Sequence, residues 1–309
     1  MIEVFRDAAG PSLAARGSVV CVGAFDGLHR GHRALLGRVR AHAAEHGLLA
    51  TAISFEPIPR EYFARGAAVP RLASVREKIL GFDEAGIERL LLLRFNSALA
   101  AMSAEAFVGE VLVGRMNAKR VIVGADFRFG HARRGGVDLL RALGREQGFE
   151  VEVMEDFRID GERVRSSRIR EMLAAGDFDA AARLLGRRFS IGGHVVRGAR
   201  LGHTLGYPTA NLRLGRRVAP VGGIFAVRVH GVGPRPMPGV ASLGVRPTVD
   251  GGEPLLEAHL FDFDGDLYGR RIAVEFVAKL RDEEKFDDLN ALTRQMDRDA
   301  DEARAILGP

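Results

Sequence analysis

Two histidines three residues apart, His29 and His32, lie in the segment GAFDGLHRGH that begins at Gly23. An apolar stretch typical of a strand precedes the segment, and a pattern typical of a helix follows it. A helix N-terminus attracts anions through its free N–H groups and its dipole, and two imidazoles there add hydrogen-bond donors. The segment therefore predicts a site that handles phosphate groups.

Four more residues of this segment are candidates for nucleotide or phosphate binding: Gly23, Phe25, Asp26 and Gly31. Glycine lets the backbone turn sharply and lets a ligand approach closely. A plainer alternative is that each histidine only caps the helix or lies on the surface. A metal site would need a third ligand, and no candidate stands nearby in the sequence.

A second set of candidates lies in the glycine-rich segment GARLGHTLGYPTAN, from Gly198 to Asn211. The chain contains no GxxxxGK[ST] segment, which excludes a standard P-loop. Gly198, Gly202 and Gly206 could still form a backbone cradle for phosphates, although such glycines often serve only as tight turns. Thr209 and Asn211 are two apart, so in an extended segment they face the same side, where their oxygens suit Mg²⁺.

Apolar and amphipathic stretches alternate through the first half of the chain. This alternation predicts a doubly wound parallel sheet with helices on both faces, a Rossmann-like fold that binds ligands at the carboxyl ends of its strands. Strands are expected at residues 18–23, 48–55, 89–95, 120–124 and 149–154, and helices at residues 31–45, 74–85, 104–115 and 136–146.

The pattern changes near residue 186, and we place a domain boundary there, between domains at residues 1–185 and 186–309. Two short helices, at 167–174 and 177–185, precede it. Beyond it, glycine- and proline-rich turns separate period-two stretches, which predicts a small antiparallel β-barrel. The barrel strands are expected at 189–196, 225–232, 255–261 and 271–280, followed by a C-terminal helix at 287–307.

Composition limits the classes of function. Hydrophobic residues make up 47% of the 309 residues and charged residues 28%, which is typical of a globular protein. The net charge is +5, but the basic residues are interleaved with Asp and Glu, and the chain has no Trp and only 3 Tyr. The sequence therefore does not show the one-sided basic stripe with stacking aromatics that is typical of a nucleic-acid groove. Cys21 is the single cysteine and is expected to be buried. With neither a signal peptide nor a membrane-length apolar run, we expect a cytoplasmic protein that binds neither membranes nor nucleic acid.

The segment HRGH resembles the signature of the nucleotidyltransferase superfamily, and RVRSSRIR, at residues 163–170, resembles its second signature. The segment VGADFRFG, at residues 123–130, and SFEPIP, at 54–59, resemble the FMN adenylyltransferase module of bacteria. Ile58 replaces a histidine common in that family, and Arg165 replaces a serine. The resemblance implies nucleotide or phosphate contacts from Asp126, Arg163, Ser166, Ser167 and Arg170.

The segment at residues 198–211 resembles riboflavin kinase, and so do residues 239–251, 256–269 and 279–292. Strand alternation places Glu257 and His259 on one face. The resemblance implies that Glu257 is the catalytic base, that Thr209 and Asn211 bind the metal, and that Arg281 and Phe286 contact the flavin. His203 stands where that family often has arginine.

Both halves together resemble the bacterial bifunctional riboflavin kinase/FMN adenylyltransferases. The resemblance implies that ATP with Mg²⁺ phosphorylates riboflavin to FMN, and that His29 and His32 assist transfer of AMP from ATP to FMN, which gives FAD. Two alternatives stay open: a monofunctional riboflavin kinase whose first domain only binds or regulates, and a flavin-dependent regulator or nucleic-acid binder suggested by the basic charge. The sequence leaves the oligomeric state open.

Overall fold

The structure is a computed structural model that describes residues 1–64, 69–198, 206–214, 218–245 and 254–308. It divides into two compact units. The first comprises Met1–Val69 and Ala73–Arg165, and the second comprises Pro70–Leu72 and Ser166–Pro309. The domain boundary at 185/186 stays a prediction from the change in sequence pattern.

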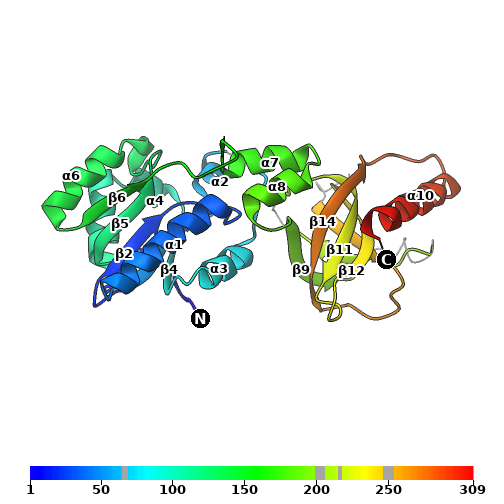
Figure 1. Cartoon of the computed structure of the whole chain (residues 1–309), viewed down its shortest axis with the longest axis horizontal. Coiled ribbons are helices and arrows are strands. Elements are labelled where there is room, and N and C mark those ends of the chain that lie inside the picture. The colour runs from blue at the N-terminus through cyan, green and yellow to red at the C-terminus, as the bar shows by residue number, and fades with distance from the viewer. Residues whose placement is uncertain (65–68, 199–205, 215–217, 246–253, 309) are drawn as a thin grey trace. The chain divides into compact units, whose positions relative to one another are not determined.

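The first unit contains a six-stranded parallel sheet in the order β1-β4-β3-β2-β5-β6 (Figure 1). The chain builds the sheet outward from β2 in both directions, so the switch point of the topology lies at the carboxyl end of β2, where ligands bind in such folds. The strands are β1 (Glu3–Phe5), β2 (Ser18–Val22), β3 (Leu49–Glu56), β4 (Arg89–Arg94), β5 (Ala118–Gly124) and β6 (Glu150–Met154).

Helices cover both faces of this sheet because alternate strand residues are apolar on each side. Val19 and Cys21 pack toward α1 and α3, whereas Val20 and Val22 pack toward η1 and α6. Cys21 is buried as predicted, and burial raises the pKa of its thiol. The helices are α1 (Arg30–Glu45), α2 (Pro59–Phe63), α3 (Val75–Glu84), α4 (Ser97–Ala101), α5 (Ala104–Ala106), the π-helix η1 (Phe107–Arg115), the 3₁₀ turn η2 (His131–Arg133) and α6 (Val137–Gln147).

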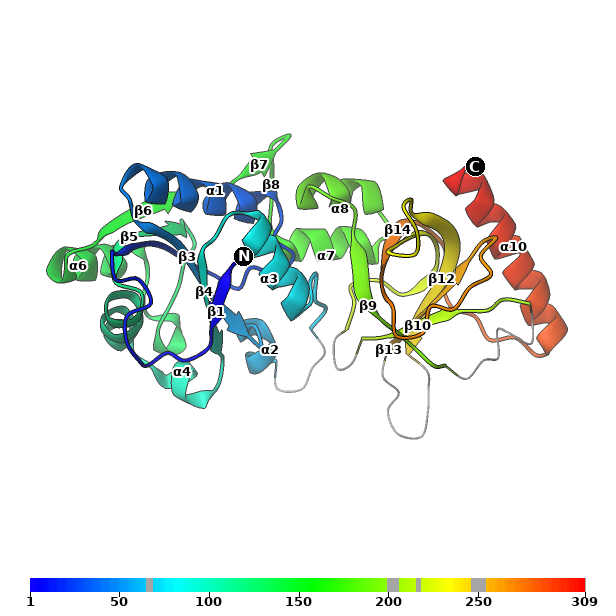
Figure 2. The ribbon, with the colours of Figure 1, turned by 90° about the horizontal axis from the view of Figure 1, so that it is seen from below.

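The second unit begins with helices α7 (Ser166–Ala174) and α8 (Phe178–Leu185) and continues into a closed antiparallel barrel. The barrel is seen in Figure 2. Its strands follow the order β10-β13-β12-β11-β14-β9. Its strands are β9 (Ser190–Val196), β10 (Ala210–Arg213), β11 (Gly223–His230), β12 (Met237–Val245), β13 (Pro254–Leu260) and β14 (Arg271–Arg281).

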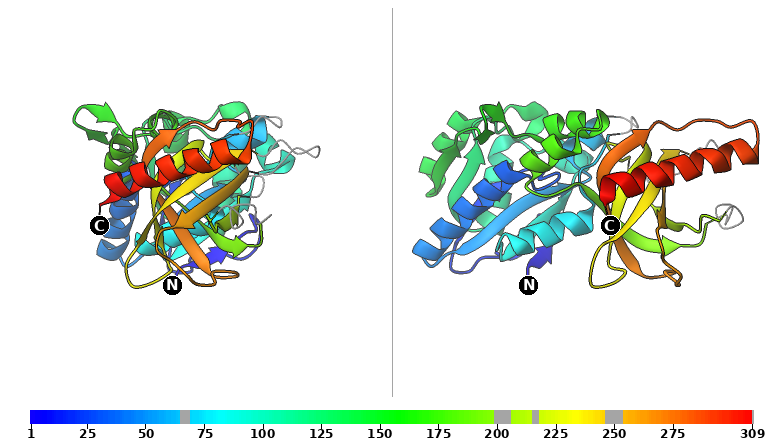
Figure 3. Two further views of the ribbon diagram at one scale, coloured as in Figure 1. Left: turned by 90° about the vertical axis from the view of Figure 1, so that its right-hand side faces the viewer. Right: turned by 45° about the vertical axis from the view of Figure 1, so that its right-hand side comes forward.

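Helix α10 (Leu289–Leu307) lies along the outside of the barrel, where Ala300, Ala303 and Leu307 pack against Phe261 and Ala226 (Figure 3). The predicted fold class, a Rossmann-like unit followed by an antiparallel barrel and a C-terminal helix, is confirmed. Strands β1, β10 and β12 were not predicted, because two of them are very short and β12 carries proline and glycine in MPGVASLGV. The small hairpin of β7 (Arg158–Ile159) and β8 (Glu162–Arg163) was not predicted either.

Candidate active sites

The histidine pair lies where β2 gives way to α1. His29 is the N-cap of α1, and its Nδ1 accepts a hydrogen bond from the His32 backbone N–H at 3.2 Å. The two rings are stacked, with centroids 3.6 Å apart and planes 12° from parallel. Since Nδ1 of His29 accepts a hydrogen bond, a neutral His29 ring carries its proton on Nε2. The structure therefore brings both imidazoles together at a helix N-terminus, as the sequence predicts.

His32 is held in its neutral form. Burial, followed by the nearby His29 and Lys78, keeps the pKa of His32 well below its ordinary value. Its Nδ1 is buried and has no hydrogen-bond partner among the described residues. Two stacked rings that were both cationic would repel each other strongly, and the neutral state of His32 avoids this.

The side chains of Phe25 and Asp26 are buried beneath the turn. The Phe25 ring is buried against Phe82 of α3, with centroids 5.0 Å apart, and against the His32 ring at 5.1 Å. Asp26 is 2% exposed, and its Oδ1 accepts the Ala73 backbone N–H at 3.2 Å, just before α3. Their side chains thus fix the turn to the α3 segment.

The two glycines of the turn that were predicted to bind nucleotide lie close to aromatic rings. A Cβ on Gly23 would lie 3.1 Å from the Phe25 ring, and one on Gly31 would lie 3.3 Å from His29 Nδ1. A larger residue at either position would push on the residues that form the turn. Because glycine has no side chain, the backbone at these two positions stays accessible to a ligand.

Asp126 and Arg163 are brought together near the carboxyl ends of β5 and β6. Arg163 Nη2 lies 2.6 Å from Asp126 Oδ2, and Nε lies 2.9 Å from Asp156 Oδ1. The three side chains are partly or largely exposed, so the guanidinium is held in place by carboxylates while it remains accessible. Phe129 is buried and stacks on Phe127 at 5.4 Å.

The second predicted phosphate motif opens α7, which belongs to the second unit. Ser166 and Ser167 are its first two residues, and Arg170 Nε donates to the Pro70 carbonyl at 2.7 Å. The two residues that depart from the family pattern differ in burial: Ile58 is buried, with 2% of its surface exposed, and Arg165 is exposed.

Lys78 is a residue that sequence reasoning missed. It is fully buried on α3, where its Nζ donates to the Phe55 carbonyl at 3.1 Å and to Ser54 Oγ at 3.5 Å, and lies 3.6 Å from Glu56 Oε2. It therefore ties α3 to the carboxyl end of β3. A lysine in an amphipathic helix is expected at the surface, so this burial could not be predicted from the sequence.

An aromatic cluster at the carboxyl ends of β3 and β4 was also missed. Tyr62 lies 5.2 Å from both Phe63 and Phe95, and Phe95 lies 5.8 Å from Phe55, measured between ring centroids. Phe63 is 60% exposed and Tyr62 37% exposed. Exposed aromatic rings that contact each other at a ligand-binding edge of a sheet suit a planar ligand.

In the barrel, three polar residues form a row across neighbouring strands. Glu257 of β13 lies directly opposite Asn211 of β10 on one side and Ser242 of β12 on the other. Directly paired residues project to the same face of a sheet. Glu257 and His259 alternate with buried residues of β13, so their predicted position on one face is confirmed.

Asn211 and Thr209 contact each other beside this row. Asn211 Nδ2 donates to the Thr209 carbonyl at 3.1 Å and to Oγ1 at 3.3 Å. Asn211 Oδ1 is buried without a hydrogen-bond partner in the described part of the chain. A Cβ on Gly198 would lie 2.6 Å from that oxygen, so only glycine leaves room beside it. An unsatisfied buried amide oxygen is costly, and a cation at this point would satisfy it.

Hydrogen bonds to α10 and to β13 hold the segment just before Thr209. The Tyr207 hydroxyl donates to Asp297 of α10, and burial together with this bond raises the pKa of Tyr207 to about 12. His259 Nδ1 lies 2.9 Å from the Pro208 carbonyl. Gly206 has a φ of +83°, which favours glycine, whereas Gly202 and His203 lie outside the described residues.

Arg281 and Phe286, the predicted flavin contacts, lie together at the end of β14. The Arg281 guanidinium lies 5.6 Å from the Phe286 ring centroid, and its Nη2 lies 2.7 Å from Asp299 Oδ2 of α10. The hydrogen bond to Asp299 raises the pKa of Arg281 above its ordinary value. Arg281 therefore anchors α10 to the barrel and supports an aromatic ring.

Two family models match the chain. The model described as FAD synthetase matches residues 12–168, and the model described as riboflavin kinase matches residues 185–307. Among curated relatives, the bifunctional riboflavin kinase/FMN adenylyltransferase of Pseudomonas fluorescens is 46% identical and covers 95% of this chain and 94% of its own. The protein of the same name from Escherichia coli K12 is 43% identical, with coverage of 94% and 93%.

A crystal structure described as a macrolide-efflux protein from Streptococcus pneumoniae is also similar, with a TM-score of 0.80, 30% identity and 98% of each chain covered. Macrolide efflux describes that protein, whereas both family models and the curated relatives of this chain agree on flavin enzymes. Within the described residues, no helix is long and apolar enough to cross a membrane.

Proposed function

The chain belongs to the family of bifunctional riboflavin kinase/FMN adenylyltransferases, and from this premise we propose which residues carry each reaction. The enzyme phosphorylates riboflavin to FMN with ATP, and it transfers the adenylyl group of ATP to FMN, which gives FAD and pyrophosphate. The presence of both modules favours this function over a monofunctional kinase or a regulator. The observation that carries the residue assignment is the position of Glu257 directly opposite Asn211.

In the kinase reaction, Glu257 is the general base. Its carboxylate accepts the proton of the terminal ribityl hydroxyl while that oxygen attacks the γ-phosphorus of ATP and the bond to ADP breaks. The strand row holds this carboxylate beside Asn211, so the base and a proposed metal ligand lie next to each other. Arg281 and Phe286 hold the flavin, with the guanidinium supporting the ring of Phe286.

Mg²⁺ fits the oxygens of Thr209 and Asn211. The buried, unpartnered Asn211 Oδ1 and the space kept by Gly198 support this assignment. When bound with ATP, the ion neutralises charge that develops on the phosphates. Gly198, Gly202 and Gly206 are the proposed backbone contacts to those phosphates.

In adenylyl transfer, His29 and His32 donate hydrogen bonds to the phosphates of ATP at the N-terminus of α1. A phosphate oxygen of FMN attacks the α-phosphorus, and pyrophosphate leaves. Gly23 and Gly31 let the phosphates approach the backbone, and Phe25 and Asp26 act by holding the turn in shape. Positioning and charge stabilisation supply the catalysis, because no covalent intermediate with the protein is needed.

Further phosphate contacts in this reaction come from Arg163, oriented by Asp126. Ser166, Ser167 and Arg170 belong to the same proposal, and for them it rests on the resemblance of their sequence alone. The aromatic cluster of Tyr62, Phe63 and Phe95 is the proposed surface for the isoalloxazine ring of FMN, since its exposed rings offer stacking partners.

The test is a chromatographic assay of purified protein with ATP and Mg²⁺, begun separately from riboflavin and from FMN. Wild-type protein is expected to convert riboflavin to FMN and FAD, and FMN to FAD. Glu257→Gln should lose only the first conversion. Retention of riboflavin phosphorylation in this variant, at the wild-type rate, would contradict the assignment of Glu257.

A further inference from the structure

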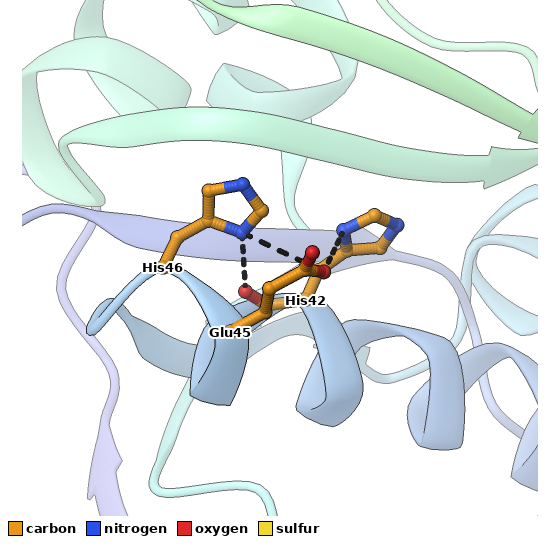
Figure 4. A group of neighbouring side chains, drawn as sticks. All are labelled: His42, Glu45 and His46. Carbon is orange, nitrogen blue, oxygen red and sulfur yellow. Dashed lines mark hydrogen bonds and ion pairs between the residues drawn. The ribbon is translucent and has the colours of Figure 1, made fainter.

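A cluster of metal-ligating side chains lies on the last turn of α1, outside the sites described above. His42, Glu45 and His46 each offer one ligand atom, and these atoms lie within 4.8 Å of one another (Figure 4). His42 Nδ1 lies 3.7 Å from Glu45 Oε2, and His46 Nδ1 lies 4.0 Å from the same carboxylate oxygen. The histidine pair of the nucleotide site stands at the other end of this 16-residue helix, about 20 Å away at 1.5 Å per residue.

The spacing explains why the three side chains meet. Residues i, i+3 and i+4 lie on one face of a helix, so His42, Glu45 and His46 project together. Two histidines four residues apart on one helical face form a common zinc-binding pair. A tetrahedral zinc ion with bonds of about 2.0–2.1 Å needs its ligand atoms about 3.4 Å apart. Small rotations of the exposed Glu45 and His46 would close the remaining distance.

A carboxylate outside the cluster orients its buried member. His42 Nε2 lies 2.9 Å from Glu152 Oε2. A carboxylate on one ring nitrogen of a metal-binding histidine fixes the tautomer and leaves the other nitrogen's lone pair for the metal. Glu152 is itself fixed by Arg38, whose Nε lies 2.6 Å from its Oε1.

The charges around the cluster favour a cation. Three carboxylates, of Glu45, Glu150 and Glu152, carry three negative charges. The guanidiniums of Arg38 and Arg120, which pair with Glu150 and Glu152, carry two positive charges, so one negative charge is left over. The cluster also lies at the C-terminus of α1, the negative end of the helix dipole. Both effects attract a divalent ion.

Two contacts compete with a metal ion. Arg120 Nη1 lies 2.9 Å from His42 Nδ1 and 3.0 Å from its Nε2, and His46 Nδ1 lies 3.0 Å from the His42 carbonyl. The ion displaces both contacts, after which Arg120 keeps Glu150 and Glu152 as partners. This competition limits the affinity of the site for a metal ion.

We propose that His42, Glu45 and His46 form a binding site for a divalent transition metal, with Zn²⁺ as the best match. Two imidazole nitrogens and one carboxylate oxygen suit this class of ion, and water completes the coordination. The ion would lock the last turn of α1 and so stabilise the first unit. His42 is buried and already oriented, while Glu45 and His46 are exposed and give the ion access.

The test uses the full chain without an affinity tag, freed of metal by a chelator and kept free of nucleotide. Calorimetric titration with ZnCl₂ is expected to give one ion per chain, and Co²⁺ should produce the visible absorption of a tetrahedral site. His46→Ala and Glu45→Gln should each weaken Zn²⁺ binding at least tenfold. Both residues are exposed, so these variants avoid the packing loss that a change at His42 would cause.

His131→Ala is the matched control, since His131 is also an exposed histidine of the first unit whose Nδ1 lies near a backbone carbonyl, 3.1 Å from Ala100 O. It should bind Zn²⁺ as tightly as wild type. Zn²⁺ should also raise the thermal unfolding midpoint of wild type and not that of His46→Ala. The proposal is overturned if wild type binds no Zn²⁺, if His46→Ala and Glu45→Gln both bind like wild type, or if only His29→Ala and His32→Ala lose the ion.

Discussion

The two candidate sites are built in opposite ways. The adenylyltransferase site gathers its central residues on one continuous turn, where His29 and His32 offer hydrogen-bond donors and Asp26 is buried against a backbone N–H. The proposed kinase site takes Glu257 and Asn211 from different strands, and it offers a carboxylate beside Asn211 Oδ1, which has no hydrogen-bond partner among the residues that the structure describes. The difference matches the nucleophiles. The phosphate of FMN is already ionised and needs no base, whereas the hydroxyl of riboflavin must lose a proton.

The largest effect should come from Glu257→Gln, which keeps the shape of the side chain and removes the base. Riboflavin phosphorylation should fall about 10²- to 10⁴-fold, the range typical of a lost general base. Conversion of FMN to FAD should stay near the wild-type rate, because the adenylyltransferase site has no such base. Separate chromatographic rates from riboflavin and from FMN measure both. A parallel loss of the two rates would contradict the comparison.

The histidine turn is tested by the His29→Ala, His32→Ala double variant. Loss of preorganised donors to the phosphates should lower adenylyl transfer by about 10²- to 10³-fold and leave riboflavin phosphorylation intact. His131→Ala serves as the control for loss of an exposed histidine in the same unit. If the double variant still forms FAD from FMN at the wild-type rate, the turn is not the phosphate site.

Lys78→Met sharpens the comparison by removing a buried cation whose charge acts on His32 of the turn. The variant should destabilise the first unit by about 2 kcal/mol, less than for a fully buried pair because Glu56 is partly exposed. It also removes a cation that lowers the His32 pKa, so that pKa should rise. Denaturant unfolding and histidine NMR titration measure the two effects. An unchanged His32 titration would show that Lys78 acts only in packing.

The smallest effect concerns pH. The pKa of His32 is below its unfolded value of about 6.5, so the unfolded chain binds the proton first as the pH falls. The stability that His32 contributes is therefore present above about pH 6.5 and is lost below it, by at most about 1.4 kcal/mol per pH unit. His32→Asn should flatten this part of the stability curve of the first unit. A variant curve parallel to that of wild type would argue against a buried neutral His32.

The same contrast explains what the sequence could predict. The histidine turn is contiguous, so its residues and their place before a helix were visible in GAFDGLHRGH. Glu257 and Asn211 are far apart in sequence, and only the register of β10 and β13 places them opposite each other. Lys78 and the His42–Glu152 contact were invisible, because burial and long-range pairing leave no local pattern. Strands β10 and β12 lacked a strong alternating pattern for a related reason: short or glycine-containing strands depend on their neighbours.

The central claim, that the two reactions use separate residues, is tested most directly by mixing two variants. Riboflavin, ATP and Mg²⁺ are given to Glu257→Gln, to the His29→Ala, His32→Ala variant, and to both together. The account predicts essentially no product from the first, FMN without FAD from the second, and FAD from the mixture, because FMN released by one protein is adenylylated by the other. Formation of FAD from riboflavin by either variant alone, at the wild-type rate, would contradict it.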